Sequence, residues 1–172
     1  MSAFVILHTV VSILPIGFGF YAYIRDGKID PRNRVGMLYV VTMLAGTVSS
    51  FGFIATLGFT PGQVLTLITL ALLVFGMITV RGHWRNAGYV QTICLSTSFL
   101  LLMVFASTET LKRVPPGEPF ATGPADPSLI PVRLGLLVLY AIGLGYQLLK
   151  LRAANGQHRV TVQPEGPAAE MM

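Results

Sequence analysis

The chain has 172 residues, of which 53% are hydrophobic and only 11% are charged, and its mean hydropathy is +0.68. A soluble domain carries roughly a quarter of its residues as Asp, Glu, Lys and Arg, so this chain has too few charges to cover a surface that faces water. The composition excludes an ordinary soluble domain and indicates an integral membrane protein.

Five apolar segments are predicted to cross the membrane as α-helices. Most have the length of about 20 residues that a helix needs to span a bilayer, and none shows the alternation typical of barrel strands. The predicted spans are residues 3–24, 35–59, 61–80, 88–111 and 130–151. The sequence therefore predicts an all-α integral membrane helical bundle over residues 1–153.

The first span carries its polar and helix-disturbing residues on one stripe. His8, Ser12, Pro15 and Gly19 are spaced so that they share one face of a helix, and we expect this face to look into the bundle. Pro15 lacks the N–H that would bond the Val11 carbonyl, which predicts a kink and a point of close packing.

Two connections carry helix-capping signals. In RDGKIDPRNR, Asp30 is predicted to cap the second span, with Pro31 at its first helical position. In GFTPGQV, Thr60 is followed three residues later by Gln63, which is the spacing of a capping box, and Pro61 lies where a missing N–H costs nothing. The second and third spans are therefore expected to form an antiparallel hairpin.

The fourth span and the segments after it differ in character. One face of the fourth span carries three small or polar side chains, those of Gln91, Cys94 and Ser98. Residues 113–131 contain six prolines, so residues 113–129 are predicted to form an extended outer loop. Residues 154–172 have few large apolar groups, which predicts a disordered cytoplasmic tail.

Nine of the twelve basic residues fall on one side of the predicted spans. They are Arg25, Lys28, Arg32, Arg34, Arg81, Arg85, Lys150, Arg152 and Arg159. Because Lys and Arg concentrate in cytoplasmic loops, we expect this side to be cytoplasmic and the N-terminus to be outside. The net charge of +5 then reflects topology in the lipid bilayer, and nucleic acid is not expected as a partner.

Small residues recur at a spacing of four within the spans. The pairs are Ala45 and Ser49, Gly46 and Ser50, and Ala141 and Gly145. Such pairs let helix backbones approach closely in lipid. We expect them to pack the bundle internally, and the alternative is a contact with a second copy of the chain or with another membrane-protein subunit.

Four polar residues near the predicted outer boundary form the candidate ligand-binding site or polar pair. They are His8, Gln63, Glu109 and Arg133. A histidine and a carboxylate at matching depth can form a hydrogen-bonded pair, which predicts a contact between His8 and Glu109. In the alternative interpretation, Glu109 and Arg133 lie at the membrane interface and His8 bonds a backbone carbonyl.

Cofactor chemistry has little support in the sequence. His83 lies at the opposite boundary from His8, and a hydrocarbon core about 30 Å thick keeps the two from ligating one haem iron. A haem with a single protein ligand, or a quinone, beside His8 is the alternative. There is no Cys/His metal spacing, no phosphate-binding loop and no serine-nucleophile motif, so no catalytic or metal site is expected.

The stretch SSFGFIATLGFTPGQVLTLITLALL, followed by an Arg-Gly pair, resembles bacterial predicted membrane proteins classed as domain of unknown function twenty-three-oh-six. Members typically show Ser-Ser-Phe ending the second helix, a Phe-Ser/Thr-Pro turn and a histidine in the first helix, which His8 matches. The resemblance covers residues 5–110. It implies a helical, multi-pass fold in a bacterial inner membrane and no established activity.

This chain also departs from the pattern of that family. It reads PRNR where members carry a His-Arg pair before the second helix, and it has Gln63 where they often carry histidine. The segment GHWRN replaces their His-Arg-Arg run at the fourth helix. If the family histidines form a metal or cofactor site, this chain has lost most of it.

Three functions fit these features. The first is a non-catalytic inner-membrane protein, either an accessory or structural subunit or a binder of a small apolar ligand. The second is a redox or cofactor-binding protein that holds haem or quinone with His8. The third is a small transporter, for which Glu109 is the acidic residue inside a predicted span.

Overall fold

The computed structural model describes residues 3–54, 58–82 and 86–161, with side chains through Asn155, and the regular structure in these ranges is helical. The elements in chain order are α1 (Ala3–Asp26), α2 (Arg34–Ser50), η1 (Phe51–Phe53), α4 (Pro61–Arg81), α5 (Ala87–Leu111), η2 (Pro127–Leu129) and α6 (Ile130–Thr161). Within these ranges, five helices are long and apolar enough to cross a membrane. The all-α class and the number of such helices are as predicted.

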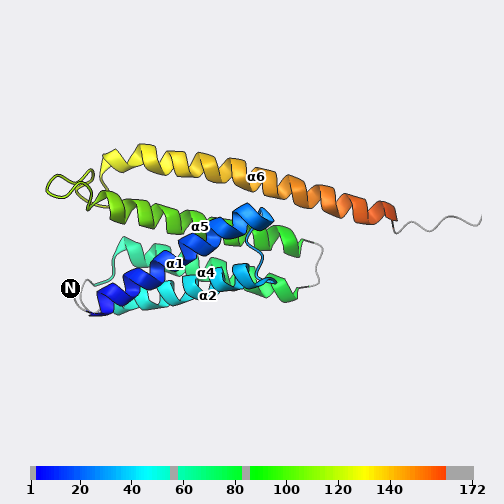
Figure 1. Cartoon of the computed structure of the whole chain (residues 1–172), viewed down its shortest axis with the longest axis horizontal. Helices are drawn as coiled ribbons and strands as arrows, with labels where there is room; N and C mark the ends of the chain where they lie inside the picture. The colour runs from blue at the N-terminus through cyan, green and yellow to red at the C-terminus, as the bar shows by residue number, and fades with distance from the viewer. Residues whose placement is uncertain (1–2, 55–57, 83–85, 162–172) are drawn as a thin grey trace, which may run out of the picture.

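The helices run up and down beside one another (Figure 1). α1 packs along α2, α2 contacts α4, and α4 packs along α5, so these four helices form a bundle. α5 also packs against α6 and contacts α1. Figure 1 shows α6 lying along α5, away from α2 and α4, so α6 is an outlying helix attached to one side of the four-helix bundle.

The cap of α4 is as predicted, but the cap of α2 is not. Thr60 and Gln63 form the capping box of α4, with the Thr60 backbone N–H donating to Gln63 Oε1 at 2.6 Å. At α2 the capping residue is Asn33, whose side chain accepts from the Gly36 N–H at 2.9 Å. The prediction of Asp30 as the cap was wrong because its carboxylate instead accepts from the Arg32 N–H at 3.0 Å, closing a turn before the helix.

The last helix is longer than the sequence pattern indicates. α6 continues to Thr161, so residues 154–161 are helical and the prediction of a disordered tail is wrong for them. These residues contain no proline, and the next one in the chain is Pro164, so nothing in the local sequence blocks continuation of the helix. Residues 162–172 lie outside the described part of the chain.

The apolar core lies inside the four-helix bundle. Its buried members come from α1, α2, α4, α5 and the connection between α1 and α2, and they include Ala22, Ile29, Tyr39, Met43, Leu73, Leu95, Phe99 and Leu102. In α6, the buried side chain among those described is Gln147. α6 is therefore held on the bundle without an apolar core of its own.

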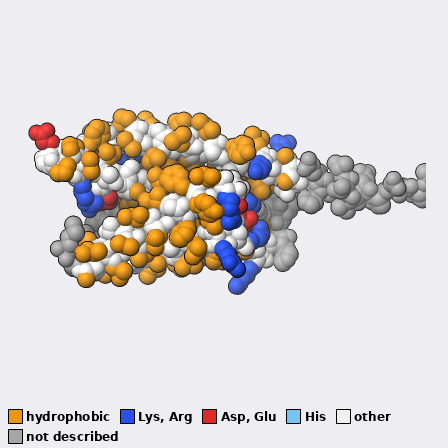
Figure 2. Space-filling model, viewed as in Figure 1, with side chains coloured by type: hydrophobic (Ala, Val, Ile, Leu, Met, Phe, Trp, Pro, Cys, Tyr) orange, Lys and Arg blue, Asp and Glu red, His pale blue; other side chains and the backbone are white. Residues whose placement is uncertain are grey.

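Charged side chains gather toward the ends of the molecule, and apolar side chains cover the flank between them (Figure 2). One end collects cations from α1, α2, α4, α6 and the α1–α2 connection. We call it the basic end, and its described residues are Arg25, Lys28, Arg32, Arg34, Arg81, Lys150 and Arg152.

Candidate functional site

The side chain of His8 in α1 lies against α2, and both of its ring nitrogens have hydroxyl partners. Nδ1 is 2.8 Å from Ser49 Oγ, and Nε2 is 3.4 Å from Ser12 Oγ. Ser49 donates its single hydrogen to the Gly46 carbonyl at 2.9 Å, so the histidine must donate from Nδ1. The ring also packs edge-on against Phe53, with 4.9 Å between centroids. His8 is thus a packing residue that bonds hydroxyl groups.

The predicted contact between His8 and Glu109 is wrong. The Glu109 carboxylate binds Lys112 at 2.8 Å and Arg113 at 2.9 Å. Both cations lie within one helical turn of Glu109, so local ion pairing satisfies the carboxylate where the sequence suggested a long-range partner. His8 bonds hydroxyl groups, so the alternative of a backbone carbonyl as its partner is not seen either.

The other two predicted site residues also have local roles. Gln63 forms the cap of α4. Arg133 donates from Nη2 to the Pro124 carbonyl at 2.6 Å and to Thr108 Oγ1 at 3.5 Å, so it ties the loop between α5 and α6 to α5. The four residues of the predicted site therefore do not converge. His83, considered as a haem ligand, lies outside the described residues.

The small-residue positions are divided between internal packing and an open surface. Gly46 lies against Ser12 of α1, and Gly19 lies against the ring of Phe99. By contrast, a Cβ added to Gly145 would meet no atom within 4 Å, and Ala141 is exposed. Internal packing therefore explains the pairing at Gly46 but not the pair on α6. The kink at Pro15, which lies buried inside α1, stays a prediction.

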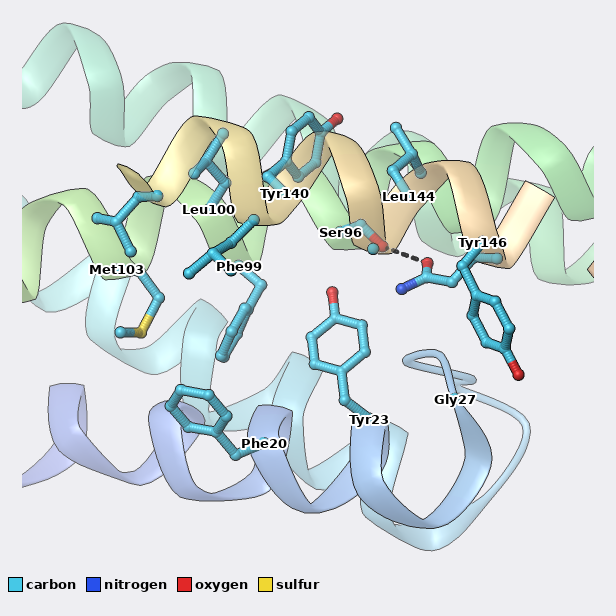
Figure 3. Close-up of a pocket in the computed structure, with 14 residues that line it drawn as sticks. Phe20, Tyr23, Gly27, Ser96, Phe99, Leu100, Met103, Tyr140, Leu144 and Tyr146 are labelled. Atoms are coloured by element: carbon cyan, nitrogen blue, oxygen red, sulfur yellow. Dashed lines mark hydrogen bonds between the residues drawn. The ribbon is translucent and has the colours of Figure 1, made fainter. Parts of the chain in front are cut away.

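A groove with a volume of about 390 Å³ lies between α1, α5 and α6. We call it the α6 groove (Figure 3). Its lining residues come from one turn or more of each helix: Phe20, Tyr23 and Gly27 at the end of α1; Ser96, Phe99, Leu100 and Met103 of α5; Leu136, Leu139, Tyr140, Gly143, Leu144, Tyr146 and Gln147 of α6. The volume falls in the range of about 300–1,000 Å³ that small-molecule sites occupy.

One end of the α6 groove is apolar and aromatic. Phe20 meets Phe99 edge to face, with 5.2 Å between ring centroids, and Tyr23 meets the same ring at 5.2 Å. Gly19 permits this arrangement because a Cβ at that position would overlap the Phe99 ring. Figure 3 shows Met103 beside these rings. This end matches a hydrocarbon chain.

The other end of the α6 groove is polar and lies toward Gly27. Ser96 Oγ donates to Gln147 Oε1 at 2.8 Å, and the two residues are only 3% and 6% exposed. Figure 3 shows the Tyr23 hydroxyl directed toward this pair. A second bond, of 2.7 Å, joins Thr97 Oγ1 and the Tyr140 hydroxyl one residue further along α5. Hydroxyl and amide groups here can bond a carbonyl, ester or hydroxyl oxygen.

The sequence analysis did not identify this groove. Gln147 is the one amide side chain in the predicted fifth span, and polar residues in membrane helices usually mark packing or function, so that residue was the available signal. Its partner Ser96 lies on a different face of the fourth span from the Gln91–Ser98 stripe. Among the described residues, no group of three His, Cys, Asp or Glu side chains is placed to hold a metal ion.

Comparison of the chain with protein-family models, with curated proteins and with solved structures found no match. The resemblance to the family of unknown function therefore stays a prediction.

Proposed function

We propose that the protein is a multi-pass protein of a bacterial inner membrane that binds an amphipathic, mainly apolar small molecule of the lipid class in the α6 groove. The observation that supports this function is the shape and chemistry of the groove: about 390 Å³ beside α5, with an aromatic end at Phe99 and a polar end at Ser96 and Gln147. A ligand there buries its chain among apolar side chains and bonds its oxygens to the polar end.

The small buried surface of α6 against the bundle also favours ligand binding. Apolar contact drives helix association poorly in lipid, where hydrogen bonds and close packing contribute more. α6 meets α5 through the bonds at Gln147 and Tyr140, and a Cβ at Gly143 in the groove wall would meet no atom within 4 Å. The space between α6 and α1 is thus open to a molecule that completes their contact.

The orientation in the membrane is part of the same proposal. The positive-inside rule places the basic end in the cytoplasm, and the Gly27 end of the α6 groove lies on that side. The polar end of the groove then lies nearer the cytoplasmic interface, and its aromatic end lies deeper in the hydrocarbon. No contact of His8 favours a cofactor, since Ser49 and Ser12 occupy both of its nitrogens.

The test uses a phosphatidylcholine that carries a photoactivatable diazirine in one acyl chain. The purified protein is irradiated with this probe, and the labelled peptides are mapped by mass spectrometry. Labelling is expected to concentrate on residues 20–27 and 136–147, which line the groove. Gly143→Phe places a ring in the groove. If the ring displaces two CH₂ groups of the acyl chain from the groove, the lipid loses about 0.8 kcal/mol of binding free energy for each, and labelling falls by roughly tenfold or more.

Gly145→Phe is the matched control. Gly145 lies two residues away on the same helix, has the same open surroundings and does not line the groove. It is expected to leave the labelling of residues 136–147 unchanged. Equal labelling of the two variants and the wild-type protein would show that the probe reports ordinary surrounding lipid, and the proposed function would be refuted.

A further inference from the structure

Lys150 lies at the polar mouth of the α6 groove. It follows Gln147 by three residues, so it is on the same side of α6 and about 4.5 Å further along the helix axis. Its Nζ is 3.7 Å from the position that a Cβ on Gly27 would take, and Gly27 lines the groove. Gly27 has φ of 72° and no side chain to fill this mouth, so the ammonium group covers the entrance directly.

Lys150 has no carboxylate partner among the described residues, unlike Arg25 and Lys28. Arg25 binds Asp26 at 2.9 Å, and Lys28 binds Asp30 at 3.2 Å. The pKa of Asp30 is lowered: burial opposes ionisation, but the Arg32 N–H and the Lys28 ammonium outweigh it. Arg25 and Lys28 are therefore neutralised, and Arg32 of the same connection donates to the Val80 carbonyl of α4. Of these cations, Lys150 is the one whose ammonium group lies beside Gly27 of the groove lining, so it carries the positive charge that an anionic ligand would meet there.

The carboxylate closest in sequence to the mouth does not oppose an anion there. Asp26 precedes Gly27, but its two oxygens accept from Arg25 at 2.9 Å each, and one also accepts from Asn33 at 2.9 Å. These bonds turn the Asp26 carboxylate toward the α1–α2 connection. The mouth of the groove is thus left with an unneutralised ammonium group.

The groove presents three kinds of surface in order from its mouth. Lys150 comes first, the hydroxyl and amide groups of Ser96 and Gln147 come next, and the aromatic end at Phe20 and Phe99 comes last. An anionic phospholipid has its phosphate, its ester oxygens and its acyl chain in the same order. Basic residues beside helices on the cytoplasmic side are a known means of binding anionic headgroups.

Building on the proposed function, we infer that the ligand is an anionic phospholipid, whose headgroup phosphate binds Lys150 while one acyl chain lies in the α6 groove. The α6 groove selects the lipid by charge at its mouth and accepts the chain by apolar contact. A neutral phospholipid with the same chains enters the groove but lacks the charge interaction at Lys150.

The experiment measures the ratio of two bound lipids. Purified protein, stripped of lipid in a mild detergent, is reloaded with equal amounts of phosphatidylglycerol and phosphatidylcholine that have identical chains. Native mass spectrometry then gives the ratio of the two bound species. Lys150→Gln is expected to lower this ratio about fivefold, the factor for one charge at a membrane surface, while Lys150→Arg keeps it. Arg152→Gln is the matched control at the same end of α6, and it should leave the ratio unchanged.

Each outcome separates this inference from the proposed function. A ratio that falls equally in Lys150→Gln and Arg152→Gln would reveal diffuse attraction to the basic end and overturn the inference. An unchanged ratio in Lys150→Gln would also overturn it, while loss of both lipids in Gly143→Phe would leave the proposed function standing. Retention of both lipids in Gly143→Phe would refute the proposed function and the inference together.

Discussion

Replacing Ser98 by alanine is expected to cost more stability than replacing Tyr39 by phenylalanine, although each change deletes one hydroxyl of the same pair. The Tyr39 hydroxyl lies 2.8 Å from Ser98 Oγ, and both residues are 0% exposed. Ser98 already donates its one hydrogen to the Leu95 carbonyl at 2.8 Å. The tyrosine must therefore be the donor and the serine the acceptor.

The two deletions leave different groups behind. Ser98→Ala leaves the buried Tyr39 O–H without an acceptor, at a cost of about 1–3 kcal/mol. Tyr39→Phe removes the donor but leaves the Ser98 hydrogen bonded to Leu95, so its cost is about 0.6 kcal/mol, the average for hydrogen bonds between membrane helices. The double variant has no stranded O–H group, so it is expected to be less destabilised than the two single costs added together.

The assay is reversible unfolding in mixed micelles, with the denaturing detergent sodium dodecyl sulfate titrated against the folded protein. The four proteins of the double-mutant cycle are compared for their free energies of unfolding. A cost for Tyr39→Phe that equals or exceeds that of Ser98→Ala would refute the assigned direction of the bond. Strict additivity in the double variant would refute the bond itself.

Three further predictions concern local structure. Gly36→Ala should destabilise the protein by about 1–3 kcal/mol in the same titration, because the added Cβ overlaps the Asp30 backbone, whereas Gly88→Ala, with open surroundings, should not. Gln63→Ala should cost about 1 kcal/mol by removing the cap of α4, without changing acyl-chain labelling in the α6 groove. The pKa of Asp126 is well below its ordinary value because two loop amide N–H groups donate to the carboxylate. The ionised carboxylate therefore stabilises the loop fully above about pH 3.9, and this stabilisation is lost as the pH falls below that value. Pepsin digestion of the loop should therefore accelerate with falling pH in the wild-type protein relative to Asp126→Asn, and an identical pH profile of the two would contradict this.

The helices could be predicted because the physics that forms them is local. A run of about 20 apolar residues forms a helix in lipid regardless of its neighbours, and a capping box such as Thr60–Gln63 acts within one turn. The cap of α2 was missed because Asp30 and Asn33 are both good capping residues. Asp30 closes a turn by accepting from the Arg32 N–H, which leaves Asn33 to accept from the Gly36 N–H, and the spacing of the two residues does not decide between these arrangements.

The candidate site was predicted poorly because matching depth in the membrane does not determine contact. His8 and Glu109 were paired by depth alone, but Glu109 is satisfied by two cations of its own helix end. The α6 groove depends on where α6 lies around α5, and no local pattern encodes that position. Ser96 and Gln147 meet across 51 positions in sequence, so their pairing becomes visible only in the folded chain.

The position of α6 follows from its polar contacts, and the groove follows from that position. In water the apolar face of α6 would drive it against the bundle, but in lipid that face is already solvated. The bonds between Ser96 and Gln147 and between Thr97 and Tyr140 join adjacent residues of α5 to positions about two turns apart on α6, so they fix the height of α6 along α5. Gln147 also bonds the Tyr23 hydroxyl of α1, so α6 meets α1 at the polar end of the groove. Gly143 has no side chain and open surroundings, so beyond this polar contact the space opposite Phe20 stays unfilled and forms the groove.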